Sequence, residues 1–340
     1  MKKLIFVVLL CSGCSYLYAR ISGMGGLVVA TVNGGQSLWF NPAGLTEGRS
    51  EIASSLSIAK FYDVDFSDIG FYIPEFSSCL NLGKGNAVGV GYTQGSYTGS
   101  ATDDIGLDSN VFMRSAAVGY SHRLGDWLSL GVNVRPYWAQ KSGSDWYFEP
   151  EGAKIKSALM FDTGLIYSFT ETAKLGFSVF NFTRPDIVHI FAPRLPTVWN
   201  IGLSNKIWDC LTYEVGYSIQ DYVITESLDS SQVMLGLDWA MIDWLSIYGG
   251  AGQLVESSDR SWLGSIGAEG KIPVGDSELA IGYDLNYIQE TIWAHTINLF
   301  YRWGEGREMR DERRETRGYK TEKPRYRQPK PRKGKREYDW

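Results

Sequence analysis

The ionisable residues of this chain that could do chemistry alternate with apolar residues. In the segment 278–287, Glu278, Asp284 and Asn286 share one side of an alternation whose other side is apolar. Residues two apart in an extended strand point the same way, so such residues line one face. Eight charged residues fit this pattern: Arg135, Asp162, Glu214, Asp238, Glu269, Glu278, Asp284 and Arg302. With Lys271 they form an acidic face. Such a face could line a polar conduit that steers a ligand, or form a self-satisfied network around a filled interior.

Motifs for metal, nucleophilic and phosphate chemistry do not support an enzyme. The sequence has no HExxH, GxSxG or GxxxxGK[ST]. His122, His189 and His295 belong to no readable Ser/His/Asp arrangement. We therefore expect no enzyme activity, no metal and no cofactor.

The elements that must position these residues are strands, because the period between residues 50 and 303 is two. Val233, Leu235, Leu237 and Trp239 alternate with polar or small residues, and helical spacing is absent. Turn-forming residues divide this stretch into about 14 predicted strands. We place them at 51–62, 66–74, 86–96, 111–122, 127–139, 157–168, 174–183, 197–206, 211–220, 230–239, 244–253, 261–271, 277–288 and 292–303.

The turns differ between the two ends of these strands. Short turns rich in Asp and Gly recur every 33 to 46 residues, near positions 126, 172, 209, 243 and 276, and longer polar loops are expected at the other end. This asymmetry, with Trp residues near strand ends, is typical of outer-membrane barrels of Gram-negative bacteria. The fold class predicted is all-β, a transmembrane antiparallel β-barrel over 51–303 in contact with outer-membrane lipid. A soluble secreted sandwich or propeller is the competing prediction.

The N-terminus predicts export. Lys2 and Lys3 precede an apolar run that is too short to span a membrane, and a small-residue site ends near Ala19, so 1–19 is a predicted signal peptide. Cys14 is a weaker candidate for lipidation, because Cys11 stands where an aliphatic residue is usual. The mature chain keeps Cys79 and Cys210, which could pair in an oxidising compartment, although the sequence does not place them within bridging distance.

The C-terminal segment 304–340 has a charge of its own. It carries 14 Lys and Arg against 8 Asp and Glu, a balance of +6, while the rest of the chain has a balance of −11. With almost no aliphatic residues, it predicts a disordered basic periplasmic tail. A basic stripe with Tyr can bind nucleic acid, but on an exported protein we expect no nucleic acid. A tether to a protein-secretion or cell-wall partner and a merely solvated tail remain open.

The segment 20–50 precedes the first strand and lacks its alternation. It is rich in Gly and contains the turn-forming cluster Asn41, Pro42, Ala43 and Gly44. It predicts either a compact insert in the barrel or a periplasmic arm leading into the first strand.

The run GMGGLVVATVNGGQSLWFNPAGL resembles the N-terminal signature of outer-membrane barrels related to the fatty-acid transporter FadL, and of PorV/PorQ-type proteins. The resemblance implies a 14-stranded barrel with an N-terminal hatch in the lumen, in which the four motif residues form the hatch. In the transporter branch it implies passage of hydrophobic molecules through a side opening. In the PorV-type branch it implies a role in type IX protein secretion.

We therefore expect a barrel that passes a small hydrophobic or amphipathic solute across the outer membrane. A secretion accessory or structural barrel without transport is the alternative. The short hatch and the basic tail depart from the family pattern, so no ligand-binding residue is transferred from it.

Overall fold

The computed structural model describes residues 28–61, 70–98, 108–144, 155–184, 196–208, 210–221, 230–256, 259–288 and 292–304. The predicted signal peptide, the start of the predicted hatch and all but the first residue of the predicted tail lie outside these ranges. Three short helical turns, η1 (Gly34–Gln36), α2 (Ser37–Phe40) and η2 (Pro42–Thr46), precede the strands. None of the described helices is long and apolar enough to cross a membrane.

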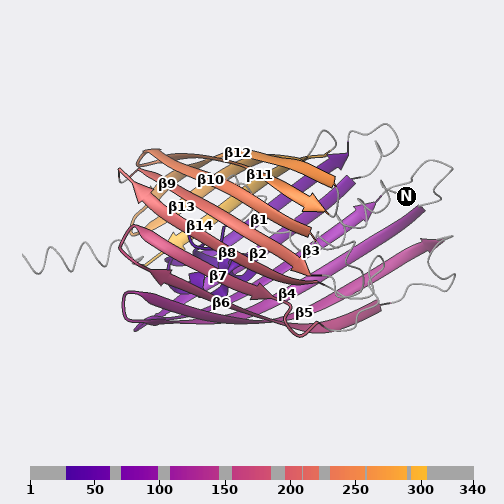
Figure 1. Cartoon of the computed structure of the whole chain (residues 1–340), viewed down its shortest axis with the longest axis horizontal. Helices are drawn as coiled ribbons and strands as arrows, with labels where there is room; N and C mark the ends of the chain where they lie inside the picture. Colours follow the sequence, from indigo (N-terminus) through magenta and orange to yellow (C-terminus); the bar gives the residue numbers. More distant parts are fainter. Residues whose placement is uncertain are drawn as a thin grey trace, which may run out of the picture. The chain divides into compact units, whose positions relative to one another are not determined.

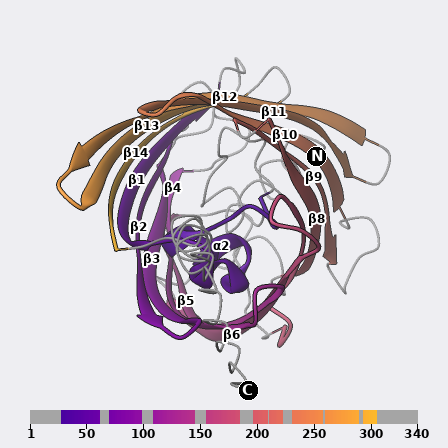
Figure 2. The same ribbon diagram turned by 90° about the vertical axis from the view of Figure 1, so that its left-hand side faces the viewer.

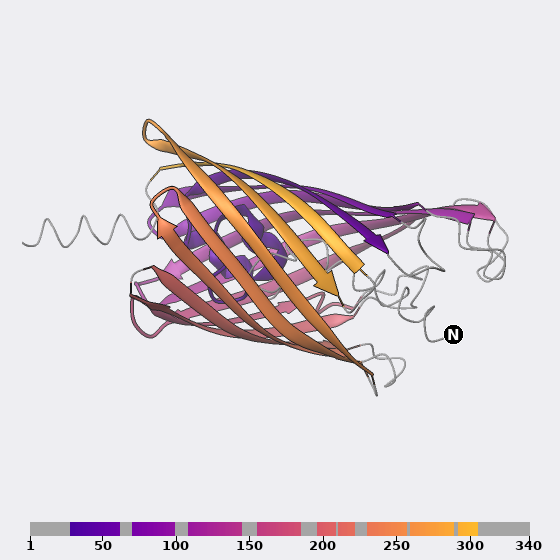
Figure 3. The ribbon, with the colours of Figure 1, turned by 90° about the horizontal axis from the view of Figure 1, so that it is seen from above.

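Fourteen antiparallel strands follow, and they close into a barrel (Figures 1 and 3). Their bounds are β1 Ser50–Phe61, β2 Gly70–Gly83, β3 Asn86–Thr98, β4 Asp108–Leu124, β5 Leu128–Ser144, β6 Ile155–Ser168, β7 Ala173–Phe180, β8 Thr197–Ile207, β9 Leu211–Asp221, β10 Ser230–Ile242, β11 Leu245–Glu256, β12 Asp259–Val274, β13 Ser277–Ile288 and β14 Ile292–Trp303. Each strand pairs with its neighbours in the chain, and β1 pairs with β14 from Ser50 opposite Trp303 to Phe61 opposite Ile292. The strand number and the closed antiparallel architecture predicted from the sequence are confirmed.

The apolar side of each alternation faces outward. Leu235 is 47% exposed and Ile281 is 50% exposed, whereas Met234 and Ala280, next to them in sequence, are buried. Closure leaves no unpaired strand edge, and an apolar exterior of this extent is unfavourable in water. This surface is the one expected of a barrel that faces lipid.

The tight turns lie at the predicted positions. Gly125 (φ 63°) and Gly275 (φ 61°) adopt left-handed backbone in the turns between β4 and β5 and between β12 and β13, where residues other than Gly are strained. A further turn at Lys84 and Gly85 joins β2 to β3.

The expectation that every connection at the other end is long is wrong. Only residues 257–258 separate β11 from β12, and only residues 289–291 separate β13 from β14. Both connections belong to the half of the barrel formed by the later strands, and the longer connections belong to the earlier strands.

The prediction for the second strand is also wrong in its bounds, since β2 runs from Gly70 to Gly83 rather than over 66–74. The chain continues as a strand through Pro74, which lacks the N–H that a ladder requires. Pro74 pairs in register with Leu56 of β1, but the pairing of β2 with β3 is interrupted at Ile73 and Pro74. The proline is tolerated because its ring lies where the ladder to β3 is open.

Candidate functional site

The described part of the N-terminal segment, residues 28–49, lies inside the barrel, and we name it the plug. Figure 2 shows α2 within the ring of strands. The helical turn η2 packs mainly on β4, β5 and β6. Leu38, Trp39, Phe40 and Leu45 are buried in one apolar cluster with Cys79 of β2. The lumen is therefore occupied, at least along this side, by the protein's own chain.

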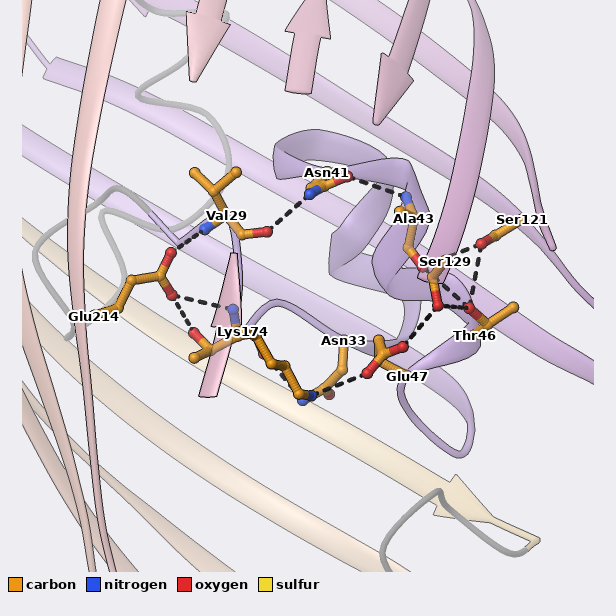
Figure 4. A network of polar contacts seen from close by, with 11 residues as sticks. Val29, Asn33, Asn41, Ala43, Thr46, Glu47, Ser121, Ser129, Lys174 and Glu214 are labelled. Atoms are coloured by element: carbon orange, nitrogen blue, oxygen red, sulfur yellow. Dashed lines mark hydrogen bonds and ion pairs between the residues drawn. The ribbon is translucent and has the colours of Figure 1, made fainter. Parts of the chain in front are cut away.

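The four motif residues shape the plug and attach it to the wall. Asn41 precedes η2, and its side-chain oxygen accepts a hydrogen bond from the Ala43 N–H at 3.2 Å, with Pro42 at the first position of the turn. The Asn41 amide nitrogen donates to the Val29 carbonyl at 2.8 Å and to the Leu165 carbonyl of β6 at 3.0 Å. Asn41 thus holds the turn, the plug's first residues and the wall together, as Figure 4 shows in part.

Glycines on the inner face of consecutive strands receive the plug. A Cβ added at Gly131 would overlap the Pro42 and Ala43 backbone, and one added at Gly164 would overlap the Asn41 side-chain oxygen. The other inward glycines that closely approach the plug are Gly89, Gly91, Gly119, Gly176 and Gly202. These seven positions lie on β3 to β8, and we call them the glycine cradle. Without side chains, the wall admits the plug backbone to within contact distance.

Glu214 of β9 anchors the first described residues of the plug. Its Oε1 accepts hydrogen bonds from the Val29 N–H at 2.6 Å and the Ala30 N–H at 2.8 Å. Its Oε2 accepts from the Thr31 N–H at 3.1 Å and from the Thr31 hydroxyl at 2.5 Å. Glu214 is 1% exposed, so four donors compensate the burial of one carboxylate (Figure 4).

A second anchor joins the end of the plug to β5 and β7. Glu47 accepts hydrogen bonds from the Ser129 hydroxyl at 2.8 Å and from the Lys174 ammonium at 2.9 Å. Thr46 donates to Ser129 and contacts Ser121 (Figure 4). Sequence reasoning missed Glu47 and Lys174. The only signal for Lys174 was its place on the inward side of the alternation in β7.

Arg302 gathers three carboxylates at the turn end of the barrel. Its guanidinium contacts Glu51 at 2.8 Å, Glu269 at 3.0 Å and Glu278 at 2.9 Å. Glu51 also accepts a hydrogen bond from the Gly35 N–H of the plug at 3.0 Å. The network therefore links β1, β12, β13 and β14 to the start of η1.

The remaining predicted inward residues lie at separate points of the wall. Arg135 forms a bidentate ion pair with Asp162, and Asp162 also accepts the Asn181 N–H at 2.9 Å. Asp284 accepts a hydrogen bond from the Asn298 amide at 2.5 Å. Asp238 occupies an inward position of β10 and is partly buried.

The structure therefore brings Glu269, Glu278 and Arg302 together. The Arg135–Asp162 pair, Glu214 and Asp284 have other described partners, and Asp238 lies on β10, two strands from Glu269. Much of the acidic face is engaged in ion pairs and plug contacts, which is the arrangement of a filled lumen.

The histidines and cysteines offer no catalytic arrangement in the described ranges. His122 contacts Asn86 at 2.9 Å and His295 contacts Tyr283 at 2.7 Å, both from outward positions, whereas the carboxylates face inward. Among the described residues, no group of His, Cys, Asp and Glu could hold a metal ion. Cys79 and Cys210 are both free thiols, and the Cys79 thiol donates to the Leu45 carbonyl of the plug at 3.3 Å.

Comparison with known proteins identifies the fold but no sequence family. No protein-family model and no curated protein sequence matches the chain. Among solved structures, the monoaromatic hydrocarbon channel CymD matches with a TM-score of 0.67 and 14% identity over 85% of this chain and 97% of that chain.

Two further channel structures match over similar lengths. The toluene transporter TbuX of Ralstonia pickettii gives a TM-score of 0.60 and 14% identity over 83% of this chain and 97% of its own. A FadL homologue of Pseudomonas aeruginosa gives a TM-score of 0.60 and 10% identity over 85% and 97%. At these identities the similarity is one of fold: this chain has the barrel fold of the FadL-type hydrocarbon channels.

Proposed function

We propose that this protein is an outer-membrane channel that passes small hydrophobic or amphipathic molecules, with the plug as its gate. The observation that carries the proposal is the plug itself. A segment of the chain lies inside a closed, lipid-facing barrel and is held there by hydrogen bonds to several strands, among them those of Glu214, Glu47 and Asn41. A purely structural barrel has no need of a separable insert seated in a cradle of glycines.

The structural matches support the same function. Two of the proteins compared above are described as a monoaromatic hydrocarbon channel and a toluene transporter, and the match covers 97% of each of them. The apolar exterior and the closed sheet support the outer membrane as the location.

Interruptions of the wall support a side exit for the solute. The ladder between β2 and β3 is open at Ile73 and Pro74, and the ladder between β4 and β5 is open at Ala116 and Ala117, opposite Pro136. Strands that lack ladder hydrogen bonds part more easily than fully paired ones. We assign the side opening to the β2–β3 interruption, because Ala117 at the other interruption is buried in the apolar cluster of the plug.

Flux through proteoliposomes tests the gate. The full chain should pass toluene and exclude a small sugar, whereas a variant lacking residues 28–48 should pass both, because the lumen is then open. Heat-modifiable migration on a gel verifies that each protein is folded. Equal fluxes of both solutes through empty liposomes and through liposomes with the full chain would refute transport.

A reversible crosslink tests the side exit. Glu75 of β2 and Thr93 of β3 lie opposite each other beside the interruption. The variant E75C/T93C should therefore form a disulfide that links β2 to β3 and keeps the two strands together. In a background without native thiols, oxidation should reduce toluene flux at least several-fold, and a reductant should restore it. The matched control is K271C/A280C across the uninterrupted β12–β13 ladder, which should leave flux unchanged. Equal flux in both states of E75C/T93C would place the exit elsewhere.

The finer expectations from the sequence stay predictions. A secretion role of the PorV/PorQ type, the signal peptide 1–19 and a partner for the tail 304–340 are not tested by any observation described above. Loss of secretion or localisation on deleting 304–340, with the barrel still folded and toluene flux retained, would favour the secretion role.

A further inference from the structure

Two polar side chains of the inner wall face each other without bonding. Ser265 of β12 and Asn286 of β13 are direct cross-strand partners, and Asn286 is 1% exposed. Both polar atoms of the Asn286 amide and the Ser265 hydroxyl lack a hydrogen-bond partner within the part of the chain that the structure describes. A buried amide with neither end satisfied is rare in folded proteins. The pair therefore offers the Asn286 amide nitrogen as a hydrogen-bond donor, the Asn286 amide oxygen as an acceptor, and the Ser265 hydroxyl as either.

An apolar cluster adjoins this pair, and its members Val29 and Met234 are 0% and 1% exposed, so the seated plug covers it. Leu263 is the next inward residue along β12, and it packs with Met234 of β10 and Val29 of the plug. Met234 reaches across β11 at Gly252, where an added Cβ would overlap the Met234 sulfur. Two strands and the plug thus build a compact apolar contact beside two unsatisfied polar groups.

The chemistry of the pair selects among solutes. A hydrocarbon would leave the amide and the hydroxyl unsatisfied, which is costly in a buried site. A carboxylate would bring only acceptors, and it would approach Asp284, the next inward residue on β13, which is also 1% exposed. A neutral hydroxyl can accept a hydrogen bond from the Asn286 amide nitrogen and donate one to the Ser265 or Asn286 oxygen.

We propose that Ser265 and Asn286 form a binding subsite for the hydroxyl group of an otherwise apolar solute, whose apolar body takes the place of Val29 beside Leu263 and Met234. The subsite rests on the proposed transport function and narrows its substrate class to neutral alcohols or phenols. The solute must therefore displace Val29, the residue whose N–H is held by Glu214. Solute binding and plug anchoring therefore both involve Val29.

Paired ligands that differ by one hydroxyl test the subsite. The full chain in lipid nanodiscs is dialysed against labelled toluene, p-cresol or 4-methylbenzoate, and binding to empty nanodiscs is subtracted. The quantity measured is the ratio of p-cresol affinity to toluene affinity. Replacement by N286L should lower this ratio about tenfold, and S265A should lower it in the same direction, because one hydrogen bond to the hydroxyl is lost. The anion should bind more weakly than toluene.

The matched control is T296V on β14. Thr296 is also inward and buried, but its hydroxyl already contacts Ser57 at 2.8 Å, so the ratio should not change. A ratio unaffected by N286L would mean that only water occupies the pair and would overturn the subsite. A structural role for Asn286 predicts instead that N286L lowers the melting temperature of the folded barrel and leaves the ratio unchanged, which would also overturn it.

Toluene flux separates this proposal from the proposed function. The T296V variant should keep the wild-type toluene flux in proteoliposomes, because Thr296 lies outside the subsite. Absence of flux from the wild type, with the affinity ratio still dependent on Asn286, would refute transport and retain the subsite. Normal toluene flux through the wild type, with an affinity ratio that does not depend on Asn286, would refute the subsite and retain transport.

Discussion

Replacing Glu214 by Gln should release the first described residues of the plug without unfolding the barrel. The Gln amide retains one oxygen, which can still accept from Val29 and Ala30, but it places an NH₂ group where Oε2 accepts two hydrogen bonds from Thr31. Hydrogen bonds to a charged group contribute about 1.5–3 kcal/mol each. Losing two therefore costs at least about 3 kcal/mol, which corresponds to a roughly 150-fold rise in the released population.

Hydrogen–deuterium exchange of the full chain in nanodiscs measures this release. The amides of Val29, Ala30 and Thr31 should exchange roughly 100-fold faster in E214Q than in the wild type, while the strand amides keep their protection. The matched control is E278Q, since Glu278 contacts Arg302 and has no plug contact among those described. Unchanged exchange at residues 29–31 in E214Q would refute the assignment of Glu214 as the anchor. Release should also raise sugar flux, because the gate is then partly detached.

The cradle and the lipid face give further predictions. Gly164→Val should displace the plug and raise sugar flux, whereas Gly264→Ala, where an added Cβ meets nothing within 4 Å, should leave flux unchanged; equal flux in the two variants would contradict the cradle. Leu235→Arg should impair assembly by roughly 2–4 kcal/mol as measured by urea-dependent folding into vesicles, and Gly236→Ser should be mild. Equal sensitivity at these neighbouring positions would show that the outward and inward faces are wrongly assigned.

The barrel could be predicted from the sequence because its signals are local. Alternation at Leu235 and Ile281 reports the two faces of a strand within ten residues, and Asp and Gly mark the turns. The error at the second strand has the same origin. Pro74 reads locally as a strand end, and only the register with β1 on one side and the open ladder to β3 on the other explains why the strand continues.

The plug site could be predicted only in part because its contacts are distant in sequence. Glu214 was recognised as an inward carboxylate, but its partners lie 183 to 185 residues away and are mostly backbone N–H groups. Any residue except proline supplies such a donor, so no residue type marks the partner. The role of Gly164 is equally hard to predict, because the sequence does not show whether an inward glycine contacts a plug, a ligand or nothing.

The two sides of the lumen differ in a way that bears on the solute path. From β3 to β8 the plug packs closely on the glycine cradle, with its backbone against Gly131 and Gly176 and its side chains against the glycines of β3 and β4, so that little room is left for a solute. From β10 to β14 the inner face carries side chains that form no described hydrogen bond with the plug, among them Met234, Leu263, Ser265 and Asn286. Side chains that are not bonded to the plug can recognise a solute and change rotamer as it passes. Under the proposed function, a solute is therefore expected to meet the side chains of β10 to β14 before it leaves at the β2–β3 interruption. Substitutions at Asn286 should then alter which solutes pass, and substitutions in the glycine cradle should alter only whether the gate is closed.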